Sequence, residues 1–241
     1  MFRFKQFIIQ QDRCAMKVGT DGVLLGAWSD VENAAHILDV GTGTGLIALM
    51  LAQRNKNAEI DAIEIEKNAC EQAAENVSNS PWANRITVFH QTLQDFFPAK
   101  KYDMIASNPP YFSQSLKNPN AEKQLARHTD SLTPEDFLRN AKRLLQFNGK
   151  LSLIFPANES YHFIKTAKTE GFFCTRLTKV FPKIGAKEKR FLMEFSLSPA
   201  LCVETDETVT ERSRSIVIEN THRHEYSEDY KNLTKDFYLN V

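Results

Sequence analysis

From residue 36 onward, short runs of apolar residues alternate with longer segments in which apolar positions recur at helical spacing. The short runs predict buried strands at 36–40, 59–65, 85–90, 102–107 and 150–156. The longer segments predict helices at 45–55, 68–79 and 133–147. The last helix begins with Thr133 as a cap and Pro134 at its first position, and Asn148-Gly149 is expected to end it. Strands that alternate with helices form βαβ units, so the sequence predicts an α/β fold with a doubly wound, mostly parallel sheet.

Beyond these strands the pattern changes to two long strand-like runs, 172–182 and 187–198, joined by a basic link. We expect them to form an antiparallel C-terminal hairpin at one end of the sheet, which gives a sheet of seven strands. Residues 215–220 predict one further short strand, and 225–239 predict a helix. We expect the whole chain, 1–241, to be a single domain.

The composition is that of a globular protein with a substantial core, since 42% of the residues are apolar and 25% are charged. No apolar run is long enough to cross a bilayer, and the N-terminus lacks the pattern of a signal peptide. The cysteines are scattered, without CxxC spacing: Cys14, Cys70, Cys174 and Cys202. This spacing argues against a zinc site or a disulfide framework. We therefore expect a reduced, cytoplasmic protein without a metal or a membrane partner.

The charges cancel overall, with 30 basic and 30 acidic residues, so the net charge indicates no particular partner. Locally they do not cancel. Basic residues dominate 1–20 and 179–190, and acidic residues dominate 204–211. These stretches fit solvated surface faces as well as contacts with nucleic-acid phosphates.

A glycine-rich turn follows the first strand, from Asp39 to Gly45. Gly41, Gly43 and Gly45 allow the backbone to turn sharply beside a ligand, and the next helix directs its N-terminus at the same place. Leu46 stands where the dinucleotide fingerprint requires its last glycine, which disfavours NAD and FAD. We assign Asp39 and the three glycines to a cofactor site.

The second strand ends at Glu64, where a carboxylate can accept hydrogen bonds from both hydroxyls of a ribose. Glu66 is the neighbouring acid, and we reject it for this role because it begins the next helix. Since ligands of doubly wound sheets bind outside the carboxyl ends of the strands, Glu64 belongs to the same site as the glycine turn.

The fourth strand runs into Asn108-Pro109-Pro110-Tyr111. Together with the glycine turn and the acid after the second strand, this order of motifs resembles the S-adenosylmethionine-dependent methyltransferases of the N6-adenine and N5-glutamine type. The resemblance implies a class I, Rossmann-like methyltransferase fold and S-adenosylmethionine as cofactor. It implies that Asn108 also borders the cofactor.

The residue types of this motif suit methyl transfer to a planar amino group. The Asn108 side-chain oxygen and the Pro109 carbonyl can both accept hydrogen bonds from an NH2 group whose lone pair is delocalised into a ring. The prolines hold these two acceptors rigid. Tyr111 offers a face on which a flipped base can stack. We expect direct transfer, with Pro110 as a rigid support and without a metal.

A narrower resemblance covers nearly the full chain. The stretches 2–7, 15–28, 80–86, 107–112 and 230–239 resemble the bacterial tRNA (adenine-N6)-methyltransferases that modify A37 in the anticodon loop of a valine tRNA. The resemblance implies a tRNA partner, an N-terminal segment 1–30 that contacts substrate and cofactor, and a C-terminal extension, 200–241, packed on it. The candidate substrate residues are Lys17, Thr20, Asp21, Phe112, Arg127, His128, Lys187 and Arg190.

Two details remain open from the residues. Thr20 or Asp21 can also be a plain cap of a short apolar helix. Methyltransferases usually present an acid to the cofactor adenine after the third strand, whereas this chain has Thr92 there and Asp95 further on. We expect Thr92 to make that contact.

Other functions are compatible with parts of the pattern. The same motif serves N5-glutamine methylation of a protein, or N6-adenine methylation of another RNA or of DNA. A nicotinamide-dependent oxidoreductase is disfavoured by the glycine spacing. An RNA-binding chaperone would leave the Asn-Pro-Pro-Tyr motif without a purpose. The basic stretches favour an RNA substrate.

Overall fold

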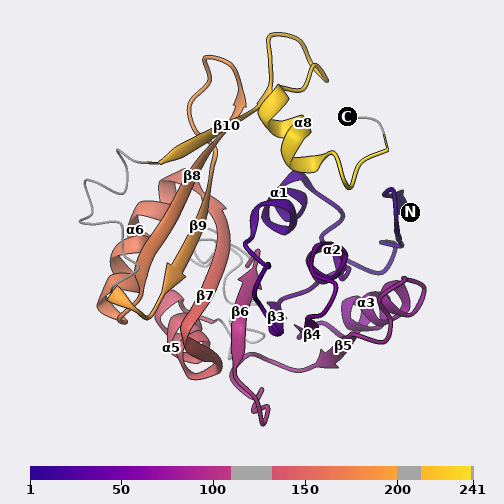
Figure 1. The fold of residues 1–241 in the computed structure, drawn as a ribbon, viewed down its shortest axis with the longest axis vertical. Helices are drawn as coiled ribbons and strands as arrows, with labels where there is room; N and C mark the ends of the chain where they lie inside the picture. Colours follow the sequence, from indigo (N-terminus) through magenta and orange to yellow (C-terminus); the bar gives the residue numbers. More distant parts are fainter. Residues whose placement is uncertain (110–131, 200–212, 240–241) are drawn as a thin grey trace, which may run out of the picture.

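The computed structural model describes residues 1–109, 132–199 and 213–239. Its centre is an eight-stranded sheet of order β10-β8-β9-β7-β6-β3-β4-β5 (Figure 1). The strands are β3 (His36–Val40), β4 (Glu59–Glu64), β5 (Ile86–His90), β6 (Tyr102–Ser107), β7 (Leu145–Pro156), β8 (Phe173–Lys183), β9 (Arg190–Ser196) and β10 (Arg214–Glu219). The pairs among β3 to β7 are parallel, whereas β9 runs antiparallel to both β7 and β8. The predicted fold class is confirmed.

Helices cover both faces of the sheet. They are α1 (Thr20–Trp28), α2 (Leu46–Arg54), α3 (Lys67–Ser78), α5 (Pro134–Leu144), α6 (Ala157–Thr169) and α8 (Glu228–Thr234). One apolar cluster holds residues of α1, α2, α3 and α8, and a second holds residues of α5 and α6. Neighbouring strand residues alternate between the clusters, as Ile37 and Leu38 do in β3. This alternation is what the two-residue period of a strand requires when both of its faces are buried.

The observed elements differ from the prediction in a few places. The helix expected over 133–147 ends at Leu144, and β7 begins at Leu145 because this residue already pairs with Tyr102 of β6. The cap at its start is confirmed, since the Thr133 hydroxyl accepts a hydrogen bond from the Asp136 amide. The helix α6 was not predicted. The further strand expected at 215–220 is present as β10, which pairs in parallel with β8 and extends the predicted seven strands by one.

The two ends of the chain meet through aromatic side chains. A short antiparallel pair of strands, β1 (Phe2–Arg3) and β2 (Ile8–Ile9), lies beside the last described residues. The Phe4 ring stacks on Tyr238 with centroids 5.7 Å apart, and the Lys5 amide donates to the Phe237 carbonyl at 2.8 Å. The aromatic residues at both ends are therefore packing residues rather than base-stacking ones.

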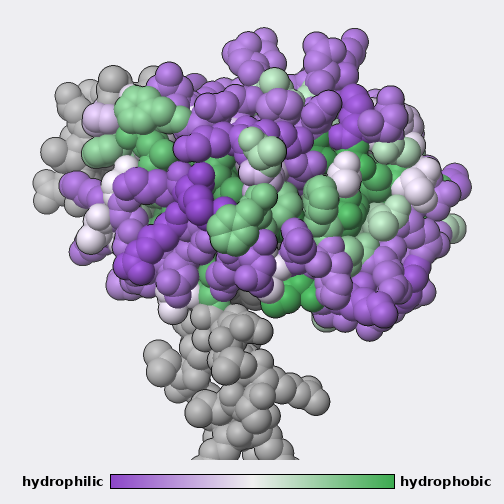
Figure 2. All heavy atoms as spheres, turned by 90° about the horizontal axis from the view of Figure 1, so that it is seen from below, coloured by the Kyte–Doolittle hydropathy of each residue, from purple (hydrophilic) through white to green (hydrophobic). Residues whose placement is uncertain are grey.

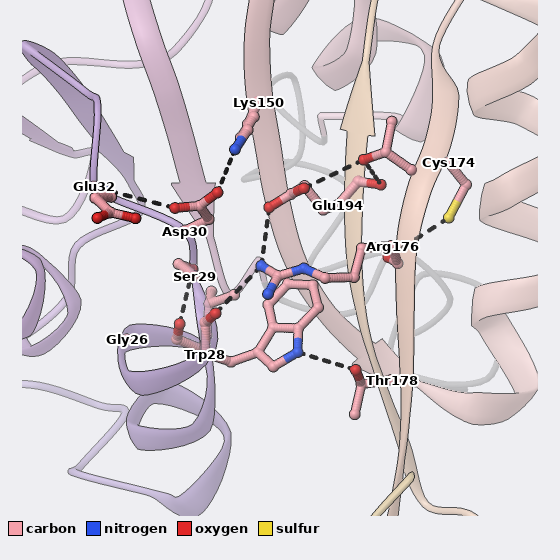
Figure 3. Close-up of polar contacts among 12 residues, drawn as sticks. Gly26, Trp28, Ser29, Asp30, Glu32, Lys150, Cys174, Arg176, Thr178 and Glu194 are labelled. Carbon is pink, nitrogen blue, oxygen red and sulfur yellow. Dashed lines mark hydrogen bonds and ion pairs between the residues drawn. The ribbon is translucent and has the colours of Figure 1, made fainter. Parts of the chain in front are cut away.

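Helix α1 and the hairpin of β8 and β9 are joined by one polar cluster (Figure 3). The Arg176 guanidinium lies 3.6 Å from the centroid of the Trp28 ring and donates to Glu194 Oε2 at 2.9 Å. The Trp28 indole N–H donates to the Thr178 hydroxyl at 3.0 Å. Stacking and hydrogen bonds together fix α1 against the hairpin of β8 and β9.

The face seen from below in Figure 1 is mainly hydrophilic, with apolar side chains in areas separated by polar ones (Figure 2). The exposed large apolar side chains include Phe97 and Phe147. Among the described residues, no helix has the length and apolar character needed to cross a membrane.

Candidate active site

The glycine turn lies between β3 and α2 and has a left-handed backbone at each glycine. The φ angles are +69° at Gly41, +57° at Gly43 and +81° at Gly45. A Cβ added at Gly41 or Gly43 would meet no atom within 4 Å, whereas one at Gly45 would meet Ala73 of α3 at 3.6 Å. The first two glycines thus border open space, and the third allows the turn to pack closely on α3.

Asp39 lies at the base of this turn and is fully buried. Its Oδ2 accepts hydrogen bonds from the Thr42 hydroxyl at 2.6 Å and from the Ala48 amide at 3.2 Å. Its Oδ1 is buried without a hydrogen-bond partner among the described residues. The two hydrogen bonds lower the pKa of this carboxyl, but burial has the larger effect and raises the pKa to about 7.

Glu64 ends β4 and holds the turn from the other side. One carboxylate oxygen accepts from the Gly43 amide at 2.8 Å. The other accepts from the Ile65 and Glu66 amides at 2.9 and 3.0 Å. Glu66 instead caps α3 by accepting from the Asn68 and Ala69 amides, as expected of the acid that begins this helix.

Asn108 follows β6 directly, next to the glycine turn. The last residue of β6, Ser107, is paired with Val40, the last residue of β3, and donates its hydroxyl to the Val40 carbonyl at 2.8 Å. The Asn108 side-chain nitrogen lies 4.0 Å from the Met16 sulfur. Pro109 is buried. The candidates Pro110, Tyr111, Phe112, Arg127 and His128 lie outside the described residues.

A cavity of about 530 Å³ opens between these elements, in the range of small-molecule and cofactor sites. Seven of the candidate residues line it: Lys17, Thr20, Asp21, Gly41, Gly43, Asn108 and Arg190. Within the cavity wall, Arg190 Nε donates to Asp21 Oδ2 at 2.7 Å, which ties α1 to β9. The structure thus brings the glycine turn, the end of β6, the start of α1 and the hairpin to one site.

Comparisons with known proteins identify the family of the chain. The family model of the methyltransferase small domain matches residues 18–181. A tRNA1(Val) (adenine(37)-N6)-methyltransferase of Parabacteroides distasonis is 47% identical over 242 residues, which cover 100% of this chain and 98% of the relative. The protein of the same name from Phocaeicola vulgatus is 48% identical over 240 residues, with the same two coverages.

The chain belongs to the tRNA1(Val) (adenine(37)-N6)-methyltransferase family. Its fold also matches a solved structure from Agrobacterium tumefaciens, described as a predicted O-methyltransferase. The TM-score is 0.64 at 20% identity, with 92% of this chain and all of that one covered. At this identity the likeness concerns the methyltransferase fold alone.

Several of the site residues predicted from the sequence lie outside the cavity lining. Asp39 and Glu64 hold the glycine turn through the hydrogen bonds given above, and Gly45 is the residue of the turn that packs on α3. Lys187 is exposed on the turn between β8 and β9. The Thr92 hydroxyl donates to Asp95 Oδ2 at 2.7 Å, so its contact with a cofactor adenine stays a prediction.

The alternative assignment of Thr20 or Asp21 as the cap of a helix is wrong. Gly19 is the N-cap of α1, and it makes no side-chain cap bond. Thr20 is the first residue of the helix, and Asp21 lies in its first turn, where it pairs with Arg190. The two side chains therefore border the cavity instead of closing the helix.

The sequence did not indicate some of the cavity residues. Met16 borders Asn108 from the N-terminal segment, and Pro182, Ile218 and Glu219 border the cavity from β8 and β10. No local pattern marks them, because the parallel pairing of β10 with β8 joins segments far apart in the chain.

No group of three or more His, Cys, Asp or Glu side chains in the described ranges is arranged to hold a metal ion.

Proposed function

We propose that the chain transfers a methyl group from S-adenosylmethionine to the N6 amino group of adenine 37 in the anticodon loop of a valine tRNA. The observation that carries this proposal is the cavity that has the glycine turn and Asn108 in one wall. The full-length likeness to relatives named for this reaction supports the choice of substrate. A tRNA substrate also favours a cytoplasmic location.

The residues around the glycine turn fit S-adenosylmethionine. Gly41 and Gly43 border space that any side chain would fill, and their positive φ angles suit glycine best. Glu64 lies outside the cavity lining, but three backbone amides fix its carboxylate beside the glycine turn, and we assign its remaining lone pairs to the ribose hydroxyls. Asp39 stabilises the turn from below through Thr42 and Ala48. When bound, the cofactor supplies an electrophilic methyl group on a sulfonium centre.

Asn108 and Pro109 bind and orient the amino group that accepts the methyl. No described residue donates to Asn108 Oδ1, so this oxygen is available as an acceptor. With the Pro109 carbonyl it accepts the two N–H groups of the adenine amine, which favours a pyramidal nitrogen with a directed lone pair. Pro110 keeps the two acceptors rigid, and Tyr111 and Phe112 stack on the flipped base.

Further residues of the cavity lining bind the rest of the substrate. Lys17 and Arg190 supply positive charge there, and the ion pair with Asp21 fixes the Arg190 guanidinium beside Thr20. We assign Arg127, His128 and Lys187 to contacts with the flanking RNA backbone, where basic side chains add affinity that depends on salt.

The deciding experiment is methyl transfer by the purified protein with the variant Asn108→Ala. Wild type is expected to label the valine tRNA at one N6-methyladenosine, and Asn108→Ala to lose at least a hundredfold in kcat at unchanged stability. The matched control is Asn57→Ala, because Asn57 is exposed and distant from Asn108 in the sequence.

Full activity of Asn108→Ala would refute the assigned mechanism. Treating a methyl-acceptor lysate with RNase separates the alternatives, because an acceptor that survives RNase points to glutamine methylation of a protein.

A further inference from the structure

The segment of residues 10–19, called here the wall segment, brings Met16, Lys17 and Gly19 into the cavity. It contains no helix or strand, and Cys14 is its only buried residue. Its own apolar contacts therefore contribute little to its order. Something else must hold it in place against the cavity.

The first contact that holds the wall segment comes from Asn76 of α3, a buried side chain that is 1% exposed. Asn76 Oδ1 accepts from the Gln10 amide at 2.8 Å, and its Nδ2 donates to the Gln10 carbonyl at 2.8 Å. The side-chain amide thus pairs with both polar groups of one backbone residue, as a neighbouring strand would.

Two further residues on the same face of α3 hold the wall segment at Arg13. Gln72 is also 1% exposed, and its Oε1 accepts from the Arg13 amide at 3.2 Å. The Arg13 guanidinium forms an ion pair with Glu75. Positions 72, 75 and 76 are neighbours on one side of a helix, so they act on adjacent points of the wall segment.

Asn76 connects this segment to the glycine turn as well. Its Nδ2 donates to the Thr44 carbonyl at 2.8 Å, inside the turn that borders the cavity. Gly45 packs against Ala73 of the same helix. One helix face therefore fixes two walls of the cavity relative to each other, although none of its residues lines the cavity.

We propose that Asn76, Gln72 and Glu75 are positioning residues. They hold the wall segment in place and thereby set the affinity of the cavity for its cofactor. This inference rests on the proposed function, since it takes the cavity to be the S-adenosylmethionine site. When the wall segment is detached, binding must first order it, and the apparent affinity falls by the fraction of attached molecules.

The test is Asn76→Asp, which keeps the shape and the acceptor but removes the two donated hydrogen bonds. A carboxylate oxygen then faces the carbonyls of Gln10 and Thr44. Each lost hydrogen bond contributes a few-fold to tenfold, so the Kd for S-adenosylhomocysteine is expected to rise roughly tenfold to a hundredfold. Asn79→Asp is the matched control, because this exposed asparagine lies one turn on and bonds only within α3.

Two readouts separate positioning from loss of folding. Hydrogen exchange of the Gln10 and Arg13 amides is expected to accelerate in Asn76→Asp, while exchange in the central sheet stays at the wild-type rate. With tRNA and saturating S-adenosylmethionine, kcat is expected to stay near wild type, so that the change appears in KM. A Gln72→Met variant, which removes one acceptor at similar volume, is the second variant and should show a smaller shift of the same sign.

Wild-type affinity and wild-type exchange in both variants would overturn the inference. If wild type binds no S-adenosylhomocysteine, the proposed function fails instead, and the exchange of the Gln10 and Arg13 amides still decides whether Asn76 holds the wall segment.

Discussion

The buried carboxyl of Asp39 makes the stability of the protein depend on pH. Its pKa is raised from 3.8 to about 7, chiefly because burial disfavours the ionised form. The folded protein therefore holds this proton more tightly than the unfolded chain does. Replacing Asp39 by Asn reproduces the protonated form, since an amide oxygen can accept from Thr42 and Ala48 while carrying no charge.

The size of the effect follows from the difference between the two pKa values. The shift is about 7 − 3.8 ≈ 3 units, and one unit corresponds to about 1.4 kcal/mol, so the ionised carboxylate costs about 4 kcal/mol in the folded state. Between these two pKa values the folded state binds more protons, and the free energy of unfolding falls as pH rises. Above about pH 7 the cost is constant.

The assay is urea unfolding of wild type and Asp39→Asn, without ligand, at pH 5, 6, 7 and 8. The variant is expected to gain on wild type by about 2 kcal/mol between pH 5 and pH 7 and by little more at pH 8. Other titrating groups contribute to both curves and cancel in the difference. A stability difference that stays constant from pH 5 to pH 8 would show that Asp39 is not held neutral by burial.

Three further predictions concern other parts of the molecule. Gly43→Ala is expected to lower stability by only about 1–2 kcal/mol, for its left-handed backbone, yet to abolish calorimetric binding of S-adenosylhomocysteine because the new Cβ enters the cavity; unchanged affinity would contradict this. Arg176→Met is expected to cost about 3 kcal/mol in thermal unfolding, because it leaves the buried Glu194 carboxylate without its cation, and adding Glu194→Gln should recover part of that loss. Lys187→Ala is expected to lower the slope of log Kd for tRNA against log salt by roughly 0.7 to 0.9, whereas Lys101→Ala, exposed before β6, should leave the slope unchanged; equal slopes would argue against an RNA contact at Lys187.

The sheet could be predicted because its signals are local. Each parallel strand is a short apolar run buried on both faces, and the ligand site lies where such strands end. The end of the helix before β7 could not be predicted, because residues 145–147 continue an apolar pattern that suits a helix. Only the pairing of Leu145 with Tyr102 decides for a strand, and that contact spans distant parts of the chain.

The candidate site shows the same division. Asp39, Gly43, Glu64 and Asn108 follow directly from their positions at strand ends. Asn76 gave no signal, because a polar residue on an amphipathic helix is usually assigned to the solvent face. Its partner is a backbone segment more than sixty residues away, and only the folded chain brings the two together.

Each of the chain's two tryptophans lies at a contact between segments that are far apart in the sequence. Trp28 lies under the Arg176 guanidinium, where α1 meets the hairpin. Trp82 packs edge-on against Phe7, just before the wall segment, with centroids 5.8 Å apart. Since indole emission depends on its immediate surroundings, Trp82→Phe leaves an intrinsic fluorophore that reports on the hairpin, and Trp28→Phe leaves one that reports on the N-terminal segment. During unfolding, the intrinsic fluorescence of the two variants can thus show, without any added label, which of these two contacts is lost first.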